Sequence, residues 1–263
     1  MDLHLEDTAA LTLASSAGLG KAAATALARE GADVVINGRT PESLEETREE
    51  IAEVATGDVV AISGDITDPD MPAELVDGTL EEFGRLDHLV TSAGGPPRLE
   101  FLETEDEHWN EAWQLLVMPV VRTVRAAAPH LEADDGGSIV AITSQIIKEA
   151  STSNVLSSSV RMTVAGLQKV LSEELAPNVR ANTILPGAYE SPRVYRGFDR
   201  MIEEGEIADY DEGRELRAEG IPVDRMGDPI ELGDTVAYLC SDRAGYINGD
   251  AIFINGGSHA STL

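Results

Sequence analysis

Two closely spaced glycines are the first residues whose types point to a chemistry. Gly18 and Gly20 follow an apolar run at 11–14 and precede an alanine-rich stretch at 21–30. Glycine reaches backbone conformations that other residues avoid and lets a ligand approach the chain. A helix that begins at such a turn directs free N–H groups and its positive dipole end at phosphate. The turn predicts a site for a dinucleotide diphosphate, although an ordinary strand–helix turn can use the same glycines.

An arginine follows the second apolar run, where it could read the ribose of that dinucleotide. The run at 33–36 leads into Asn37, Gly38 and Arg39. An acidic residue there would accept a hydrogen bond from the 2′-hydroxyl of NAD, whereas arginine suits the 2′-phosphate of NADP. We therefore predict NADP, in preference to NAD, as the cofactor. The alternative interpretation of Arg39 is a solvated surface side chain.

Apolar, β-branched runs alternate with helical patterns, and these elements must position the site. The expected strands lie at 11–14, 33–36, 59–62, 86–90, 138–142, 179–185 and 251–254. The expected helices lie at 21–30, 43–54, 73–83, 106–127, 154–175 and 230–241. Such alternation implies a parallel sheet with helices on both faces, and right-handed crossovers make it doubly wound. The sequence predicts one α/β Rossmann-type domain over residues 1–263, with ligands beyond the carboxyl ends of the strands.

The charge balance excludes several classes of partner. The chain has 48 Asp and Glu residues against 19 Lys and Arg, for a formal net charge of −29. An acidic surface of this kind repels nucleic acid and anionic membranes. The acids are spread along the whole chain, which suggests a halophilic source in which salt screens the self-repulsion.

The apolar runs and the single cysteine exclude further classes of protein. No apolar run of 18 residues offers a membrane span, and the N-terminus lacks the pattern of a signal peptide, so we expect a cytoplasmic protein. The single cysteine, Cys240, excludes a disulfide within the chain, and no cluster of ligand types predicts a metal site.

Several segments resemble motifs of the short-chain dehydrogenase/reductase family, in particular its 3-oxoacyl-acyl-carrier-protein reductases. The turn at 14–20 is similar to the family's glycine motif, with Ala14 in place of the first glycine. The segments at 65–66, 91–95, 180–187 and 255–257 resemble later motifs in the family's order, which covers about residues 6–258. The resemblance implies cofactor contacts at Ala14, Ser16, Gly18, Leu19, Gly20, Arg39, Asp65, Ile66, Ala93, Gly94, Arg161, Pro186, Gly187 and Ser191.

The same resemblance implies a hydride-transfer site in which most of the usual catalytic side chains are replaced. In the family, a tyrosine exchanges a proton with the substrate oxygen, a lysine four residues later supports it, and a serine binds that oxygen. Ser144 fits the serine, whereas Ser157 and Arg161 stand at the tyrosine and lysine positions, and Leu116 replaces a supporting asparagine. A serine hydroxyl is too weak an acid to replace tyrosine, but a guanidinium could bind ribose or stabilise an oxyanion.

Two further side chains are candidates for the missing proton donor. Lys148 lies four residues after Ser144, in the loop expected to border the substrate, and Tyr189 lies two residues after Gly187. Either could instead be a surface or lid residue. By resemblance, the polar, irregular stretch at 190–222 forms a substrate lid, and the helix at 106–127 pairs subunits into a homodimer or homotetramer.

Three functions remain open at this point. The first, which we predict, is an NADP(H)-dependent oxidoreductase that acts on a small carbonyl or hydroxy compound through an atypical proton relay. The second is a catalytically silent nucleotide-binding relative, a sensor or a supporting subunit, because tyrosine, lysine and asparagine are lost together. The third is a lyase or isomerase on the same scaffold, since function belongs to the site and not to the fold.

Overall fold

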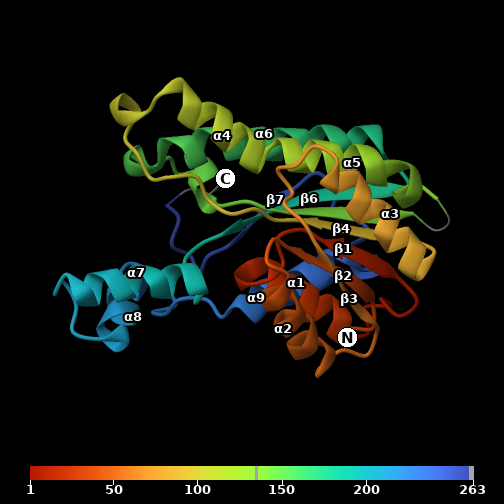
Figure 1. Cartoon of the computed structure of the whole chain (residues 1–263), viewed down its shortest axis with the longest axis horizontal. Helices are drawn as coiled ribbons and strands as arrows, with labels where there is room; N and C mark the ends of the chain where they lie inside the picture. The colour runs from red at the N-terminus through yellow and green to blue at the C-terminus, as the bar shows by residue number, and fades with distance from the viewer. Residues whose placement is uncertain (134–135, 261–263) are drawn as a thin grey trace.

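A seven-stranded parallel sheet forms the centre of the protein, with helices on both faces (Figure 1). The computed structural model describes residues 1–133 and 136–260. The order in the sheet is β3-β2-β1-β4-β5-β6-β7. The strands are β1 (Ala9–Thr12), β2 (Asp33–Gly38), β3 (Val59–Ser63), β4 (His88–Thr91), β5 (Gly137–Ile142), β6 (Val179–Pro186) and β7 (Ala251–Ile254). The predicted doubly wound α/β fold is confirmed.

Two helical layers enclose the sheet. One layer contains α1 (Gly18–Arg29), α2 (Pro41–Ala52) and α9 (Pro229–Cys240). The other contains α3 (Met71–Phe83), α4 (Asp106–Leu116), α5 (Met118–Leu131) and α6 (Val155–Glu174). Each layer buries its own apolar cluster against the strands. The alanine-rich face of α1 allows α9 to approach so closely that a Cβ on Gly233 would overlap the backbone of α1. Among the described helices, none is long and apolar enough to cross a bilayer.

The predicted helix at 106–127 is wrong in its continuity, because the structure divides it into α4 and α5. The division falls at Val117, which ends α4 and precedes α5. Pro119 stands in the first turn of α5, where its missing N–H has no helical partner to lose, whereas inside one long helix the same proline would break a hydrogen bond.

The stretch at 190–222 is more regular than the sequence predicted. It contains α7 (Pro192–Glu203) and α8 (Tyr210–Ala218), which project from the sheet edge beyond β6 (Figure 1). Pro192 begins α7, and the carboxylate of Asp209 accepts hydrogen bonds from two amides at the start of α8. The ring of Phe198 is fully buried in a small cluster with Ile207, so this segment has its own core.

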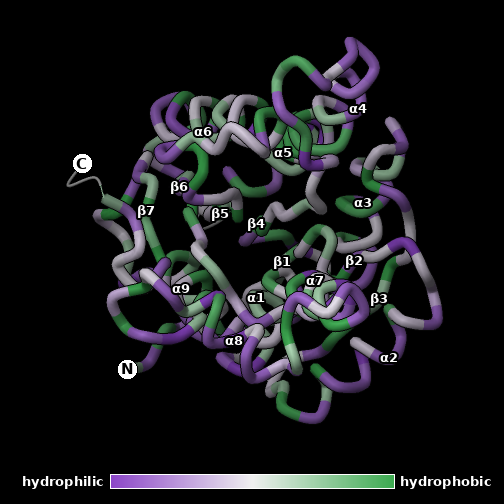
Figure 2. The backbone as a smooth tube through the Cα atoms, turned by 90° about the vertical axis from the view of Figure 1, so that its left-hand side faces the viewer, coloured by the Kyte–Doolittle hydropathy of each residue, from purple (hydrophilic) through white to green (hydrophobic). Residues whose placement is uncertain are grey.

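The sheet order reverses between β1 and β4, which are neighbours although β2 and β3 intervene in the chain. Ligands of such sheets bind beyond the carboxyl ends of the strands at this reversal. Figure 2 looks toward this end of the molecule, with α4 above the strands and α7 and α8 in front of them. The short helices η1 (Phe101–Glu103), η2 (Gln145–Ile147), η3 (Thr152–Asn154) and η4 (Asp242–Ala244) complete the described elements.

His88 on β4 is a buried titratable group away from this edge. Its Nδ1 atom lies 3.0 Å from the hydroxyl of Ser138, and its Nε2 atom has no hydrogen-bond partner among the described residues. Burial lowers the pKa of His88 below its ordinary value of 6.5, because a cation would lose its hydration there.

The lowered pKa of His88 predicts a pH dependence of stability. Below pH 6.5 the unfolded chain binds a proton that the folded chain does not, so the free energy of unfolding should fall as pH decreases. The expected slope from this group is about 1.4 kcal/mol per pH unit until the folded pKa is reached. Urea unfolding at several pH values should show that His88→Leu removes this slope, whereas His130→Leu, on an exposed position, keeps it. Identical slopes for all three proteins would contradict the assignment.

Candidate active site

The turn after β1 has the geometry of a phosphate site. Ala14 and Gly18 adopt the left-handed conformation, with φ of 49° and 60°. A Cβ on Gly20 would come within 2.5 Å of the carbonyl oxygen of Ala14, so only glycine allows α1 to start this close to the strand. No side chain caps the first turn of α1, and none of its residues is acidic. The N–H groups there are therefore available, and the turn fits a dinucleotide diphosphate.

The end of β2 borders the same turn. The buried amide of Asn37 donates to the carbonyls of Ile62 and Gly64 and so fixes this strand end. A Cβ on Gly38 would lie 2.7 Å from Cβ of Ser16, so the two segments are in direct contact. Arg39 follows with an exposed side chain, and no carboxylate occupies the place of Gly38. This arrangement puts a positive charge, and no acidic side chain, at the end of β2.

Asp65 and Ile66 follow β3 as predicted, but they differ in environment. The carboxylate of Asp65 accepts hydrogen bonds from N and Oγ1 of Thr67, at 2.9 and 2.8 Å. The backbone hydrogen bond from Thr67 is the main cause that lowers the pKa of Asp65, and the charge of Arg39 adds to it. Ile66 is buried. Asp65 therefore stays ionised and rigid near Arg39.

Arg161 is the most unusual residue at the strand edge. Its side chain is buried on α6, its Nε donates to Oγ of Ser157 at 3.1 Å, and its Nη2 donates to the carbonyl of Gly94 at 2.6 Å. Burial, together with a smaller effect from the nearby charge of Arg193, lowers the pKa of Arg161 to about 10. Among the residues that the structure describes, no carboxylate forms an ion pair with it. The helical spacing of four residues brings Ser157 and Arg161 to one face.

Ser144 lies two residues after the end of β5, at the same edge. Its half-buried hydroxyl accepts a hydrogen bond of 3.4 Å from the amide of Ile146 and so caps η2. The short helix η2 packs against α6, the helix of Ser157 and Arg161. The structure thus brings together Gly94, Ser157 and Arg161, with Ser144 on the adjoining segment.

The segment after β6 closes the site from the other side. A Cβ on Gly187 would overlap Cβ of Asn255 and approach Oε1 of Gln145, so Pro186 and Gly187 lie against the closing turn. The Oε1 atom of Gln145 accepts from Nδ2 of Asn255 at 2.8 Å. Ser191 stands next to the phosphate turn, because a Cβ on Gly18 would lie 3.9 Å from its own Cβ.

Two of the predicted proton donors have other partners. The hydroxyl of Tyr189 is buried and donates to the carbonyl of Ile254 at 2.9 Å, and burial, then the charge of Glu231, raises its pKa. A hydroxyl that is fixed on a backbone carbonyl and harder to ionise than usual is a poor proton donor, so we correct the expectation for Tyr189. Lys148 is exposed, and its ammonium lies 4.9 Å from the ring centre of Phe253. This cation–π contact gives it a place beside β7.

Sequence reasoning did not identify Gln145 or Arg193 as site residues. Gln145 carries no motif and is recognised only by its contacts with Asn255 and Ser258. Arg193 packs against Gly95 so closely that a Cβ there would overlap the guanidinium. One feature of the sequence could have pointed to Arg193. Basic residues are rare in this chain, so an arginine close to the end of a strand is informative.

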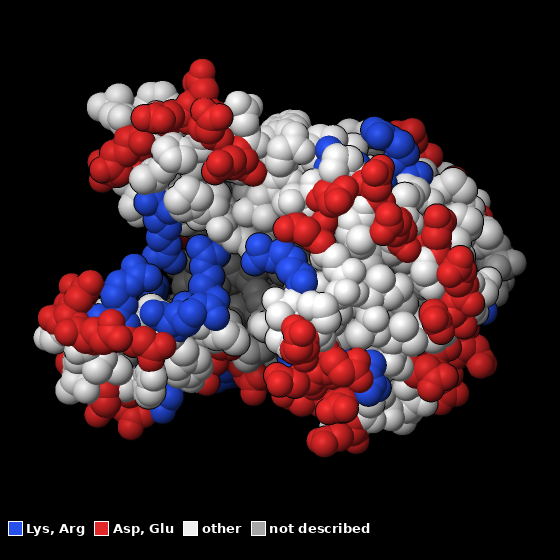
Figure 3. Space-filling view, viewed as in Figure 1, with Lys and Arg blue, Asp and Glu red and all other residues white. Residues whose placement is uncertain are grey.

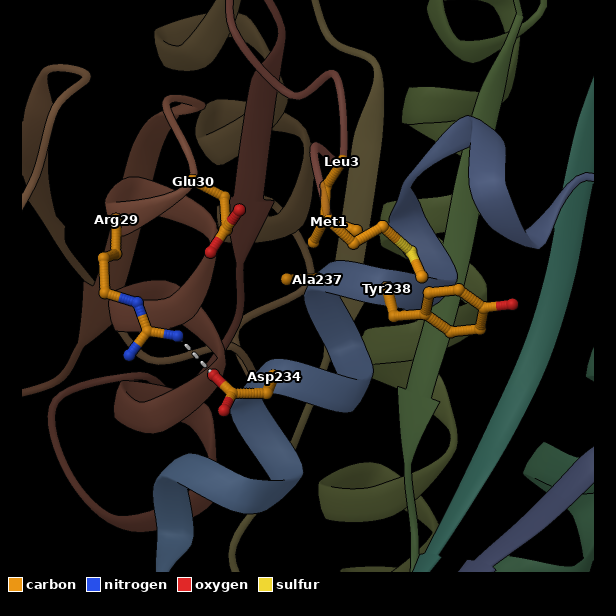
Figure 4. Close-up of a pocket in the computed structure, with 7 residues that line it drawn as sticks. All are labelled: Met1, Leu3, Arg29, Glu30, Asp234, Ala237 and Tyr238. Atoms are coloured by element: carbon orange, nitrogen blue, oxygen red, sulfur yellow. Dashed lines mark hydrogen bonds and ion pairs between the residues drawn. The ribbon is translucent and has the colours of Figure 1, made fainter.

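A separate cavity lies away from this edge, between α1, α9 and the N-terminal segment (Figure 4). Its volume is about 380 Å³, and the ion pair between Nη2 of Arg29 and Oδ1 of Asp234, at 2.5 Å, borders it. None of the predicted site residues lines this cavity. We therefore place the chemistry at the strand edge and not here.

The fold and the phosphate turn together define a Rossmann-type dinucleotide-binding protein. The family model described as enoyl-(acyl carrier protein) reductase matches residues 13–259. The chain therefore belongs to this family, within the short-chain dehydrogenases/reductases.

The relatives agree with this assignment. The chain is 31% identical over 260 residues to dehydrogenase/reductase SDR family member 4 of Caenorhabditis elegans, covering 98% of this chain and 97% of that protein. L-sorbose reductase from Gluconobacter frateurii, solved with NADPH and L-sorbose, superposes with a TM-score of 0.95 at 29% identity over 99% and 100% of the two chains. A short-chain oxidoreductase from Pseudomonas aeruginosa PAO1, described as containing an atypical catalytic center, has a TM-score of 0.90 at 30% identity over 98% and 99%. These similarities support an NAD(P)-dependent oxidoreductase.

The environment of Tyr189 leads to a direct test of its role. Tyr189→Phe should lower the free energy of unfolding by about 0.5–1.5 kcal/mol, because the carbonyl of Ile254 loses one of its two donors and keeps the amide of Gly187. Nucleotide affinity and turnover should not change. Thermal unfolding and nucleotide titration measure both effects, and Tyr246→Phe, at a fully exposed position, is the control. Loss of turnover without loss of stability would instead support Tyr189 as the proton donor.

Proposed function

We propose that the protein is an NADP(H)-dependent oxidoreductase that interconverts a small carbonyl compound and its alcohol through an atypical proton relay. One observation carries the proposal. The buried guanidinium of Arg161 bonds to Ser157 and Gly94 at the same sheet edge as the uncapped start of α1. Positive charge, hydroxyl groups and a phosphate site therefore meet at the carboxyl ends of β1, β4 and β5.

Several residues fit NADP at this edge. The amides at the start of α1 bind the diphosphate, and Arg39 binds the 2′-phosphate. Arg161 has further N–H groups beyond the two that bond to Ser157 and Gly94, and these can hold ribose hydroxyls or a substrate oxygen. When bound, the nicotinamide supplies or accepts the hydride.

The proton relay uses hydroxyl groups in place of a titratable side chain. Because Nε of Arg161 donates to Oγ of Ser157, the hydroxyl proton of Ser157 is directed elsewhere. Ser144 and Ser157 would pass a proton, which the buffered solvent replaces, to the substrate oxygen, and the cation of Arg161 would stabilise the negative charge that develops on that oxygen. Loss of a positioned general acid costs about 10²- to 10⁴-fold, so slow turnover is expected.

A catalytically silent relative is the second candidate. It is favoured by the same contacts, because the Arg161 guanidinium is already bonded to protein atoms on two sides. In this case NADP(H) binds without turnover, and the protein acts as a sensor or as a supporting subunit. Oxidation of NADPH by the purified protein with any carbonyl of a panel would exclude it.

We also infer a cytoplasmic, halophilic homodimer or homotetramer. Exposed apolar side chains on α4 and α6 support association, since Trp113 is 41%, Met162 50% and Val170 55% exposed. Asp and Glu side chains cover much of the face in Figure 3, as expected for a protein adapted to high salt. Neither nucleic acid nor membranes suit this surface, so we propose a small molecule as the substrate.

The role of Arg161 is testable with a carbonyl panel and NADPH at high salt. Arg161→Met should reduce turnover by about 10²- to 10³-fold, because the developing oxyanion loses its nearest cation. Arg125→Met, at an exposed position on α5, should have no effect. Since the pKa of Arg161 is lowered to about 10, the activity that needs its charge should fall as pH rises through 10. Unchanged turnover in Arg161→Met would reject this mechanism.

Cofactor choice is testable at Arg39. Arg39→Asp should weaken NADP binding by about 10- to 100-fold, because an attractive contact with the 2′-phosphate becomes repulsive. NAD affinity should stay the same or improve, since aspartate can accept from a 2′-hydroxyl. Fluorescence titration of both nucleotides measures the ratio, and Arg125→Asp controls for net charge. Equal affinity of the unmodified protein for NADP and NAD would refute the role of Arg39.

A further inference from the structure

Basic side chains gather in one hollow of an otherwise acidic protein. Figure 3 shows Lys and Arg side chains lining the space between the segment around α4 and the segment of α7 and α8. Four arginines are linked in series by electrostatic interactions, because Arg193 interacts with Arg98 and Arg196, and Arg161 interacts with Arg193. We call Arg98, Arg161, Arg193 and Arg196 the arginine cluster.

Three different segments supply the arginine cluster, so it is a product of the fold. Arg98 lies in the segment between β4 and η1, Arg161 on α6, and Arg193 and Arg196 on α7. Arg193 and Arg196 are three residues apart and share one face of α7. The cluster runs from a buried member, Arg161, to exposed members at positions 98 and 196. It therefore extends from the proposed reacting centre to the mouth of the hollow.

The arginine cluster has no acidic partners within the described part of the chain. Other arginines form ion pairs with carboxylates, for example Arg29 with Asp234 and Arg225 with Glu231. None of the four members does so. With 48 acidic residues available for 19 basic ones, unpaired arginines that lie together are unexpected. Their mutual repulsion is relieved when an anion enters.

We infer that the arginine cluster binds an anionic group, a carboxylate or a phosphate, on the substrate of this protein. The inference rests on the proposed oxidoreductase function, because it names the substrate class of that site. The guanidinium fork bonds both oxyanions in a bidentate manner and provides strong, directional contacts. The substrate is therefore an oxo or hydroxy compound with a negative charge near its reacting carbon.

The cofactor has other sites for its own phosphates. The uncapped start of α1 takes the diphosphate, and Arg39 at the end of β2 takes the 2′-phosphate. The arginine cluster instead approaches from β4 and α7, with Arg161 bonded to Gly94 and Arg193 packed on Gly95. This position suits a molecule that enters through the hollow and presents its carbonyl beside Ser157.

Calorimetric titration of the NADP-loaded protein at constant ionic strength tests the inference. The probes are two matched pairs, acetoacetate with methyl acetoacetate, and dihydroxyacetone phosphate with dihydroxyacetone. In at least one pair the anion should bind about tenfold or more tightly than its neutral partner. Arg193→Gln and Arg196→Gln should each remove about tenfold of that preference. Arg125→Gln changes the net charge equally and should keep it.

The outcomes separate the inference from the proposed function. No preference for the anion in either pair overturns the inference, even if the protein turns over neutral carbonyls. Variants that weaken NADP affinity and leave the anion preference intact also overturn it, because the cluster then serves the cofactor. Anion binding that depends on the cluster without any turnover supports the inference and refutes the oxidoreductase. Arg193→Lys, which keeps the charge, should retain most of the affinity, and thermal unfolding confirms that each variant is folded.

Discussion

The close approach of the first helix to the first strand is the constraint on which the rest of the structure depends. Gly20 lies against the carbonyl of Ala14, and no larger side chain would fit there. The first turn of α1 therefore begins at the sheet edge with amides that no side chain satisfies. Unpaired N–H groups at a helix start favour an anion, and this property fixes where a dinucleotide diphosphate can bind. The other site residues are described by where they lie relative to the start of α1.

The second feature is a cation that the protein buries without a carboxylate. Removing a guanidinium from water is unfavourable, and Arg161 offsets part of the cost through Ser157 and Gly94. The lowered pKa reflects the remaining penalty. Because the fold holds this guanidinium at the edge of the sheet where ligands bind, it can interact with a negatively charged group there. Arg193 has an exposed side chain, and its pKa is lowered by partial desolvation and by the charges of Arg98 and Arg196.

The acidic surface and the basic hollow have complementary effects. A net charge of −29 disfavours polyanionic partners. A small anion is repelled by the same surface, so a concentrated group of arginines is needed to bind it. Solvent and salt screen the exposed carboxylates, so their repulsion of a small anion weakens with distance.

The sequence by itself determined the class of fold. The periods of strands and helices are local properties of the sequence. The Gly18–Gly20 turn is also readable locally, because its backbone geometry requires glycine, and it predicts the phosphate site. The break between α4 and α5 was missed, since Pro119 is equally compatible with the first turn of a new helix and with a kinked one. The helices α7 and α8 were missed because their polar surfaces hide a small core around Phe198.

Only the tertiary structure decided which side chains meet. Tyr189 reads as a proton donor beside Gly187, but its hydroxyl is held by Ile254, which lies on a strand 65 residues later. The arginine cluster joins positions 98, 161, 193 and 196, and no local pattern connects them. Contacts between distant segments depend on sheet order and helix packing, which a single sequence specifies only through the whole fold. The sequence therefore named the candidate residues, whereas only the fold shows which partners they contact.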